Sequence, residues 1–339
     1  MLLSDFDFPF DPSLIAVHPE IPRDRARLLV LDRATGHISH HLVADLPELL
    51  KSGDLVVAND TKVLPARVGG HVAHTGKAVD ILFVRDVGQG TWEVLIKGKL
   101  RAGHIIQVSP QVSLLVTERS RVRTTVRIEG GGVVDELMQE FGRMPLPPYI
   151  KRPPVREDYD WYQTVFARSE GAIAAPTAGL HFTERLVADL QGRGIGFTTV
   201  TLHVGPGTFR PVTADHVEEH RMDAEVMEVP ERTVQMIQDT RIHGGRVVAI
   251  GTTVTRALES AVGTTGQVRS LRGETSLFIK PGFVFRAVDG LLTNFHLPRT
   301  TLLMLVSAFT GTERLRNAYA AAVTARYRFY SYGDAMLIR

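Results

Sequence analysis

The sequence contains no cysteine, so disulfide bonds, thiolate metal sites and catalysis by a cysteine nucleophile are excluded. It also lacks any apolar run near the roughly 20 residues that a membrane-spanning helix requires. The most apolar later run covers only 302–306. The N-terminus carries early acidic residues and no basic-then-apolar signal pattern. We therefore expect a cytoplasmic protein without membrane contact.

A large excess of either charge is absent too. Lys and Arg number 39 against 37 Asp and Glu, a net charge of +2 at pH 7, so a basic surface for nucleic acid would have to be local. The 339 residues are 44% hydrophobic and 22% charged, which is ordinary for a globular protein. That length allows a large core and favours two domains.

The stretch 171–209 has the most informative pattern. Small apolar residues lead into a Pro/Gly turn, Thr183 caps a short helix that glycines end, and 195–204 returns as an apolar strand. Together these features predict one β-α-β unit. Ligands bind at the carboxyl ends of parallel strands. The loops after these two strands carry Thr177, Gly179 and His181, then His203, Gly205, Gly207 and Thr208.

Three other apolar runs are predicted to end at the same edge of one sheet. Run 54–58 ends on Asn59 and Asp60, run 246–250 ends before Thr252 and Thr253, and run 291–293 ends on Asn294 and His296. A turn former or a helix cap explains each residue taken alone. Repeated placement of such side chains favours a shared site. Further strands are expected at 276–279 and 283–285.

Residues 63–129 consist of short alternating runs separated by glycine turns, with no helical period. This pattern predicts a small antiparallel barrel or sandwich. A short helix at 135–141 and a proline-dense return segment at 144–154 follow. We therefore predict an α/β main domain with a mostly parallel or mixed sheet, formed by residues 1–62 and 150–339. A barrel-like all-β domain with its return linker, 63–149, is inserted into it.

Two groups of basic side chains are candidates for RNA contact. The first is four arginines of one parity, which a single strand would place on one face: Arg119, Arg121, Arg123 and Arg127. A solvated strand face explains them, and a phosphate-binding stripe is the alternative. The second is Lys151 and Arg152, expected to be exposed together with Tyr149; a plain connector explains this segment equally well.

No metal site is predicted. His216 and His220 have the i, i+4 spacing of a helical metal pair, but nothing fixes a third ligand. A Rossmann methyltransferase pocket is not expected either, because no Gly-x-Gly-x-x-Gly motif opens a helix.

Several segments, in order along essentially the whole chain, match one known family. They are Asn-Asp-Thr-Lys-Val-Leu-Pro-Ala-Arg67, Met-Pro-Leu-Pro-Pro-Tyr-Ile150, Ala-Ala-Pro-Thr-Ala-Gly-Leu-His-Phe-Thr183, Leu-His-Val-Gly-Pro-Gly-Thr-Phe209, Thr-Asn-Phe-His-Leu-Pro298, Leu-Leu-Met-Leu-Val-Ser-Ala-Phe309 and Tyr-Arg-Phe-Tyr-Ser-Tyr-Gly-Asp-Ala-Met-Leu-Ile338. Together they resemble the S-adenosylmethionine:tRNA ribosyltransferase-isomerase family of queuosine biosynthesis. Two positions depart from that family: Pro206, which should only stiffen its loop, and Asp223, where the family more often has His.

The resemblance implies an enzyme that transfers the ribosyl part of S-adenosylmethionine to the aminomethyl group of a 7-deazaguanine base at the wobble position of tRNA. The ribosyl group isomerises, epoxyqueuosine forms, and adenine and methionine leave. S-adenosylmethionine is then a co-substrate and tRNA a partner. No metal or redox cofactor is implied, and we expect a monomer.

That chemistry requires groups that exchange protons near pH 7, because an ylide can form beside the sulfonium and adenine must be protonated as it leaves. The candidate proton-transfer residues are His181, His203, His296 and Asp60. The candidate substrate-binding residues are Asn59, Arg67, Thr177, Gly179, Gly205, Gly207, Thr208, Thr252, Thr253 and Asn294. Two alternatives stay open, a non-catalytic RNA-binding protein that uses the β insertion and a small-molecule hydrolase that uses His and Asp with water.

Overall fold

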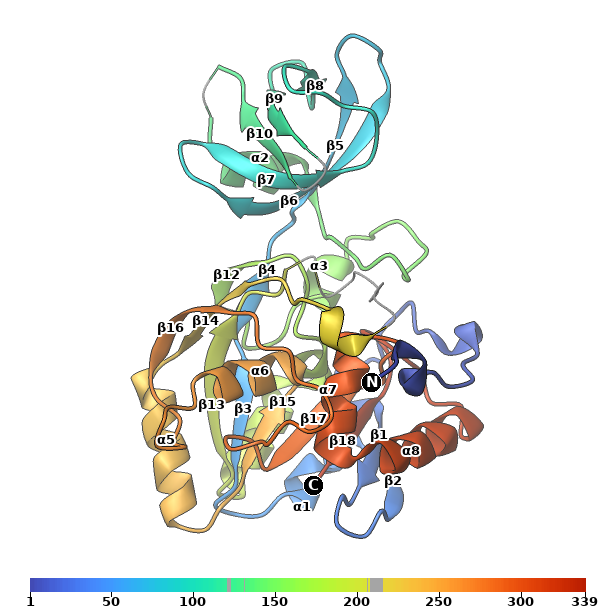
Figure 1. The fold of residues 1–339 in the computed structure, drawn as a ribbon, viewed down its shortest axis with the longest axis vertical. Helices are drawn as coiled ribbons and strands as arrows, with labels where there is room; N and C mark the ends of the chain where they lie inside the picture. Colours follow the sequence, from blue (N-terminus) through green and yellow to red (C-terminus); the bar gives the residue numbers. More distant parts are fainter. Residues whose placement is uncertain (121–122, 131, 206, 208–215) are drawn as a thin grey trace.

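The computed structural model of the chain describes residues 1–339 except 121–122, 131, 206 and 208–215. Figure 1 shows two bodies, a large α/β part that contains both termini and a β-barrel that stands apart from it at the top of the view. The chain enters the barrel after β4 (Thr61–Val63) and leaves it after β11 (Gly142–Arg143). The predicted combination of an α/β part and a small all-β unit is confirmed.

The α/β part is built on a nine-stranded mixed sheet with the order β16-β14-β13-β3-β15-β17-β18-β1-β2. Its strands are β1 (Arg27–Leu31), β2 (Ile38–Leu42), β3 (Leu55–Asn59), β13 (Gly196–Leu202), β14 (Glu225–Val229), β15 (Val247–Ile250), β16 (Leu271–Thr275), β17 (Gly290–Asn294) and β18 (Ala335–Ile338). Strands β13, β3, β15 and β17 are parallel, so their carboxyl ends lie at one edge. Strands β3 and β15 are buried on both faces and accordingly read as near-continuous apolar runs.

Helices cover both faces of this sheet. The α-helices of the chain are α1 (Leu46–Leu49), α2 (Val134–Phe141), α3 (Asp158–Trp161), α4 (Glu184–Gly192), α5 (Glu231–Ile242), α6 (Thr252–Ser260), α7 (Thr301–Thr310) and α8 (Thr312–Thr324). Short 3₁₀ helices are η1 (Leu3–Phe6), η2 (Pro12–Leu14), η3 (Arg23–Arg25), η4 (Val43–Asp45), η5 (Thr177–His181) and η7 (Val217–Glu219). Side chains of α5, α6, α7 and α8 pack in one hydrophobic cluster, and those of α1 and α4 pack in another.

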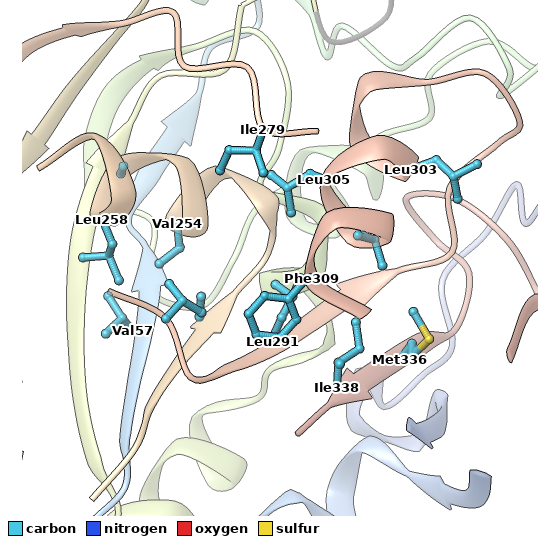
Figure 2. Close-up of a cluster of buried hydrophobic side chains, with 14 of the residues drawn as sticks. Val57, Val254, Leu258, Ile279, Leu291, Leu303, Leu305, Phe309, Met336 and Ile338 are labelled. Carbon is cyan, nitrogen blue, oxygen red and sulfur yellow. The ribbon is translucent and has the colours of Figure 1, made fainter. Parts of the chain in front are cut away.

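Alternation along β3 explains these two layers. Val57 points into the α6 side and Val56 into the α4 side, since successive side chains of a strand face opposite ways. Figure 2 shows part of the larger cluster, to which Val57 of β3, Val254 of α6 and Phe309 of α7 all contribute. Helix α7 begins after Thr300, and the Thr300 side chain caps it by accepting from the Leu303 amide at 3.3 Å.

The inserted unit is a closed six-stranded antiparallel barrel. Its strands are β5 (Arg67–Val72), β6 (Ala78–Asp86), β7 (Thr91–Ile96), β8 (Ile105–Gln107), β9 (Ser113–Arg119) and β10 (Thr124–Ile128). They follow the order β5-β6-β7-β10-β9-β8, the pairing of β5 with β8 closes the barrel, and β11 adds to β5. Inward side chains such as Ile81, Phe83 and Val126 fill the interior, and Leu137 of α2 joins the same cluster.

The β-α-β prediction for 171–209 is wrong in its pairing. Strand β12 (Ser169–Ala172) pairs with β4 in a separate two-stranded sheet, and the neighbour of β13 is β3. The physical reason is composition. A strand that reads Ser-Glu-Gly-Ala cannot supply the apolar surface that a position between helical layers requires, whereas β3 can.

The strands expected at 276–279 and 283–285 are also wrong, because the structure has no strand in either segment. The last strand before them is β16. Ile279 is buried in the main cluster and Phe285 packs against it, so these side chains are apolar because they cover the core. The Pro281-Gly282 turn between them has φ +97° at the glycine, which interrupts any ladder.

Candidate active site

A pocket opens at the carboxyl edge of the four parallel strands and encloses about 780 Å³, counted out to its opening. Its walls come from the segments after β12, β15 and β17, from α6 and α7, and from Tyr149 and 330–331. Several predicted site residues line it together: Thr177, Thr252, Thr253, Asn294 and His296. The position at the carboxyl edge of parallel strands is typical of a ligand site.

The N-terminus of α6 forms one wall. Gly251 precedes the helix with φ +94°, and a Cβ there would lie 3.4 Å from the Cβ of Ala178, so this turn requires glycine. Because glycine has no capping side chain, the first backbone N–H groups of α6 face the pocket without an intrahelical acceptor. Asn59, at the end of β3, donates to the Leu202 carbonyl at 2.9 Å and lies 3.4 Å from Thr253 Oγ1.

His181 lies outside the lining of the pocket, and the amide of Asn294 connects it to the pocket. The Asn294 Nδ2 donates to the Tyr330 carbonyl at 3.0 Å and to Nε2 of His181 at 3.1 Å. The Asn294 Oδ1 is buried without a partner among the described residues. Burial lowers the pKa of His181 to about 4. The imidazole is therefore neutral at pH 7, as a general base must be.

His296 lines the pocket itself. Its Nε2 lies 2.9 Å from Thr293 Oγ1, and its backbone N–H donates to the Tyr319 hydroxyl at 2.9 Å. Burial lowers the pKa of His296 to about 3. This imidazole is neutral at pH 7 as well, so neither histidine brings a positive charge to a ligand in the pocket.

Aromatic side chains form another wall. The rings of Tyr149 and Tyr330 stack with centroids 3.8 Å apart, and the Tyr149 hydroxyl lies 2.5 Å from Ser331 Oγ. Burial raises the pKa of Tyr149 well above its usual value, so this hydroxyl stays protonated. The expectation of a fully exposed Tyr149 is therefore wrong, because the return segment folds back onto the loop before β18.

His203 lies outside the lining of the pocket. Its Nδ1 is 2.8 Å from Thr61 Oγ1. Its ring packs on Gly171, where an added Cβ would lie 2.9 Å from the imidazole. The pKa of His203 is lowered, because desolvation outweighs the opposing effect of the Asp60 carboxylate.

Asp60 also lies outside the lining, buried behind the end of β3. Its carboxylate accepts hydrogen bonds from Thr201 at 2.6 Å, Thr199 at 3.1 Å and Arg168 at 2.6 Å. The Arg168 guanidinium is thereby fixed in an exposed position beside the sheet edge.

The remaining predicted substrate-binding residues are spread more widely. Gly179 packs on Phe166 and Thr164, the Gly205 amide donates to Glu225 at 3.0 Å, and Gly207 abuts Asp223. Thr208 and Pro206 lie outside the described residues. Arg67 lies in β5 of the barrel, paired with Asp80 at 2.8 Å, and it does not line the pocket.

The arginine series is not on one strand. Strand β9 ends at Arg119 and β10 begins at Thr124, so the alternating arginines lie on two strands of a hairpin. The Ser120 amide of this hairpin donates to the Arg123 carbonyl at 2.8 Å. Arg119 is partly buried and donates to the carbonyls of 96 and 98. Arg127 is exposed, whereas Arg121 lies outside the described residues. The expectation of one strand face is therefore wrong.

The two cations of the return segment differ from each other. Lys151 is exposed. Arg152 makes a two-pronged ion pair with buried Asp158, at 2.6 and 2.7 Å, and its side chain is only 15% exposed. The expectation that Arg152 is exposed is therefore wrong, because a buried carboxylate requires a partner.

Arg256 is the lining residue that sequence reasoning missed. It lies one turn after Thr252 on the pocket face of α6, and its guanidinium pairs with Glu225 of β14. Both side chains are almost fully buried. The i, i+4 spacing from Thr252 was the available signal, but only the structure shows that this helix face meets a pocket.

No metal centre emerges within the described ranges, since no three His, Asp or Glu side chains there are arranged to hold an ion. None of the helices that the structure describes has the length and apolar character needed to cross a membrane.

Comparison with known proteins gives one consistent result. The family model described as "Queuosine biosynthesis protein" matches residues 3–338. An S-adenosylmethionine:tRNA ribosyltransferase-isomerase from Citrifermentans bemidjiense is 48% identical, with all of both chains covered. The one from Aquifex aeolicus is 46% identical over the same full coverage. A crystal structure of S-adenosylmethionine tRNA ribosyltransferase from Thermotoga maritima is 36% identical, covers 99% of this chain and 100% of its own, and superposes with a TM-score of 0.58.

Proposed function

The chain belongs to the queuosine biosynthesis protein family, and from that premise we propose that it moves the ribosyl moiety of S-adenosylmethionine onto the 7-aminomethyl-7-deazaguanine base at the tRNA wobble position. The product is epoxyqueuosine, and adenine and methionine are released. The chain is an enzyme, because its full-length relatives are transferase-isomerases. S-adenosylmethionine is a co-substrate, and we propose a cytoplasmic monomer without a resident cofactor.

One observation carries the placement of the chemistry in this chain: Thr177, Thr252, Thr253, Asn294 and His296, from three separate segments, meet in a single pocket. It combines free helix amides, a buried amide oxygen and stacked tyrosines. Such a lining suits a ligand that joins a purine, a ribose and an amino acid.

The neutral histidines suit the proton transfers of this reaction. Removal of a proton beside the sulfonium requires an unprotonated base, and departure of adenine requires a proton at the ring. His181, with Nε2 directed at Asn294, and His296, with Nε2 directed at Thr293, have lowered pKa values and are neutral before substrate binds. We propose that they exchange protons with the substrate, and that His203 and Asp60 support the neighbouring backbone.

The tRNA must deliver its wobble base to the pocket opening. We propose that exposed basic side chains contact the phosphates of the tRNA. The candidates are Arg127 on the barrel and Lys151 on the return segment. Arg168, exposed and held by Asp60, lies at the same sheet edge as the pocket. Phosphate contacts of this kind position a nucleic acid without reading its sequence.

The decisive experiment incubates the full chain with S-adenosylmethionine and tRNA that carries the precursor base. Nucleoside mass spectrometry should detect epoxyqueuosine, and chromatography should detect adenine in a matching amount. The control is the same tRNA with guanine at the wobble position, which should yield neither product. Absence of epoxyqueuosine with the precursor tRNA would refute the proposal.

The same experiment tests the two alternatives. A non-catalytic RNA-binding protein would bind the tRNA but release no adenine. A small-molecule hydrolase would act on its substrate whether or not tRNA was present. Release of adenine that depends on the precursor base fits neither alternative.

A further inference from the structure

Arg256 is held in one orientation by three contacts. The residue is 5% exposed. Its Nε donates to the Leu277 carbonyl at 3.0 Å, and its Nη1 donates to the Glu225 carboxylate. The other oxygen of Glu225 accepts from the Gly205 amide at 3.0 Å, so the carboxylate cannot turn away. A guanidinium fixed by a buried acid and a carbonyl loses little freedom when it binds a further group.

The second terminal nitrogen of Arg256, Nη2, takes part in none of these contacts. Among the described residues, Nη2 is buried and has no hydrogen-bond partner. A buried donor without a partner is costly, and each such group calls for an explanation, of which a bound water, ion or ligand is one. Because Arg256 lines the pocket, Nη2 is available to a ligand bound there.

The start of α6 adds further donors on the same side. Thr252 precedes Arg256 by one helical turn and also lines the pocket, so the two residues share a helix face. With Gly251 as the N-cap, the first amides of this nine-residue helix have no capping side chain. The positive end of the helix dipole therefore points toward the same space as Nη2.

From these observations we propose that this end of the pocket binds the carboxylate of the methionine portion of S-adenosylmethionine. One carboxylate oxygen accepts a hydrogen bond from Arg256 Nη2, and the other accepts hydrogen bonds from the amides at the start of α6. Glu225 neutralises the formal charge of Arg256, so recognition depends on directed hydrogen bonds more than on net charge. The inference rests on the proposed function, since it assumes that the pocket binds this co-substrate. The polar α6 end then holds the amino acid, and the end near Tyr149 and Tyr330 is left for the adenosine.

The test compares two ligands on the full chain by isothermal titration calorimetry: S-adenosylmethionine and its decarboxylated analogue, which differ only in the carboxylate. The wild-type protein should bind the analogue roughly 10- to 100-fold more weakly, as expected for loss of hydrogen bonds to a charged group. Arg256→Lys keeps a positive charge beside Glu225 but removes the fork, so it should reduce the difference between the two affinities to the part that the α6 amides supply.

A second variant guards against misfolding. Arg256→Gln combined with Glu225→Gln removes both buried charges together and leaves neither unpaired. It should also reduce the difference between the two affinities. Equal binding of the two ligands by the wild type would overturn the inference, and so would variants that weaken both ligands in the same proportion, because that is what a purely structural Arg256 does. No binding of S-adenosylmethionine by the wild type would instead overturn the proposed function, and the inference with it.

Discussion

Asn294 and His181, 113 positions apart in the chain, are joined by a hydrogen bond of 3.1 Å from the amide nitrogen to Nε2. The orientation of this amide is set independently, because its nitrogen also donates to the Tyr330 carbonyl at 3.0 Å. An amide nitrogen can only donate, so Nε2 of His181 is the acceptor and its proton resides on Nδ1. A residue of the pocket wall thus fixes the tautomer of a buried imidazole.

This relationship predicts the effect of removing either partner. His181→Ala should lower turnover by about 100-fold or more, the usual contribution of a positioned acid-base group. Asn294→Ala should lower it less, because the imidazole remains but its orientation is lost. Adenine release under saturating S-adenosylmethionine and precursor tRNA measures both. The matched control is His243→Ala, an exposed histidine after α5. Near-normal turnover in a folded His181→Ala variant would remove that residue from the proton-transfer groups.

The buried histidines also predict an acid sensitivity of the fold. Folded-state pKa values of about 4 for His181 and about 3 for His296 lie below the value near 6.5 of an unfolded chain. The unfolded state therefore binds more protons below pH 6.5. Stability should be complete above that pH and should fall as the pH drops toward 4, by up to roughly 1.4 kcal/mol per pH unit for each histidine.

Urea unfolding of the wild type and of His296→Gln between pH 5 and pH 7.5 measures this effect. The variant starts less stable, but its curve should fall less steeply below pH 6.5, because one titrating group has been removed. Carboxylates titrate in both proteins and cancel in the comparison. Parallel curves for the two proteins would show that His296 is not buried in its neutral form.

The edge of the sheet was predictable from sequence because its signals are local. Each of β3, β15 and β17 is an apolar run that ends in Asn, Thr or His, and a parallel arrangement of such runs brings their ends together. Pocket residues Thr252, Thr253 and Asn294 follow from that pattern alone. The helix caps at Thr183 and Thr300 were predictable for the same reason, since a capping hydroxyl acts within three residues.

The rest of the pocket could not be predicted, because long-range packing decides it. The Tyr149 ring contacts Tyr330, 181 positions further along the chain, and nothing in the local proline pattern indicates that contact. The prediction that the arginines from 119 to 127 share one strand face was wrong for a related reason. Arginine and apolar residues alternate in the same way along one long strand and along two strands joined by a hairpin. Only the pairing of Arg119 with Thr124 shows that this segment is a hairpin.

The return segment supplies a prediction on stability. Arg152 and Asp158 form a buried pair at 2.6 and 2.7 Å, and Asp158 also accepts from the Tyr332 hydroxyl at 3.0 Å. Arg152→Ala leaves that carboxylate buried without its cation, which should lower the free energy of unfolding by about 3–5 kcal/mol. Urea denaturation measures the loss. Lys151→Ala, the exposed neighbour, should change it by less than about 0.5 kcal/mol.

A small effect of Arg152→Ala on stability, equal to that of Lys151→Ala, would mean that solvent reaches the pair. Binding of precursor tRNA distinguishes the two cations further. If Lys151 contacts phosphate, Lys151→Ala should weaken binding without loss of stability, and the weakening should shrink as salt is added.

The barrel hairpin supplies the last prediction, on the salt dependence of tRNA binding. Arg127 is exposed on β10, whereas Arg119 on β9 donates its guanidinium to Thr124 and to the carbonyls of 96 and 98. Only a guanidinium free of such contacts can bind phosphate without breaking the barrel. Arg127→Ala should therefore reduce the slope of log affinity against log salt by about 1, and leave the barrel folded.

Arg119→Ala is the matched comparison, because it removes the same charge from the neighbouring strand. It should destabilise the barrel by about 1–3 kcal/mol, the cost of stripping donors from buried acceptors, and should change the salt slope little in the fraction that remains folded. Fluorescence anisotropy with labelled precursor tRNA from 50 to 300 mM salt gives the slopes. A slope near zero for the wild type, or equal slopes for wild type and Arg127→Ala, would mean that the tRNA does not use this face of the barrel and reaches the pocket over the α/β part alone.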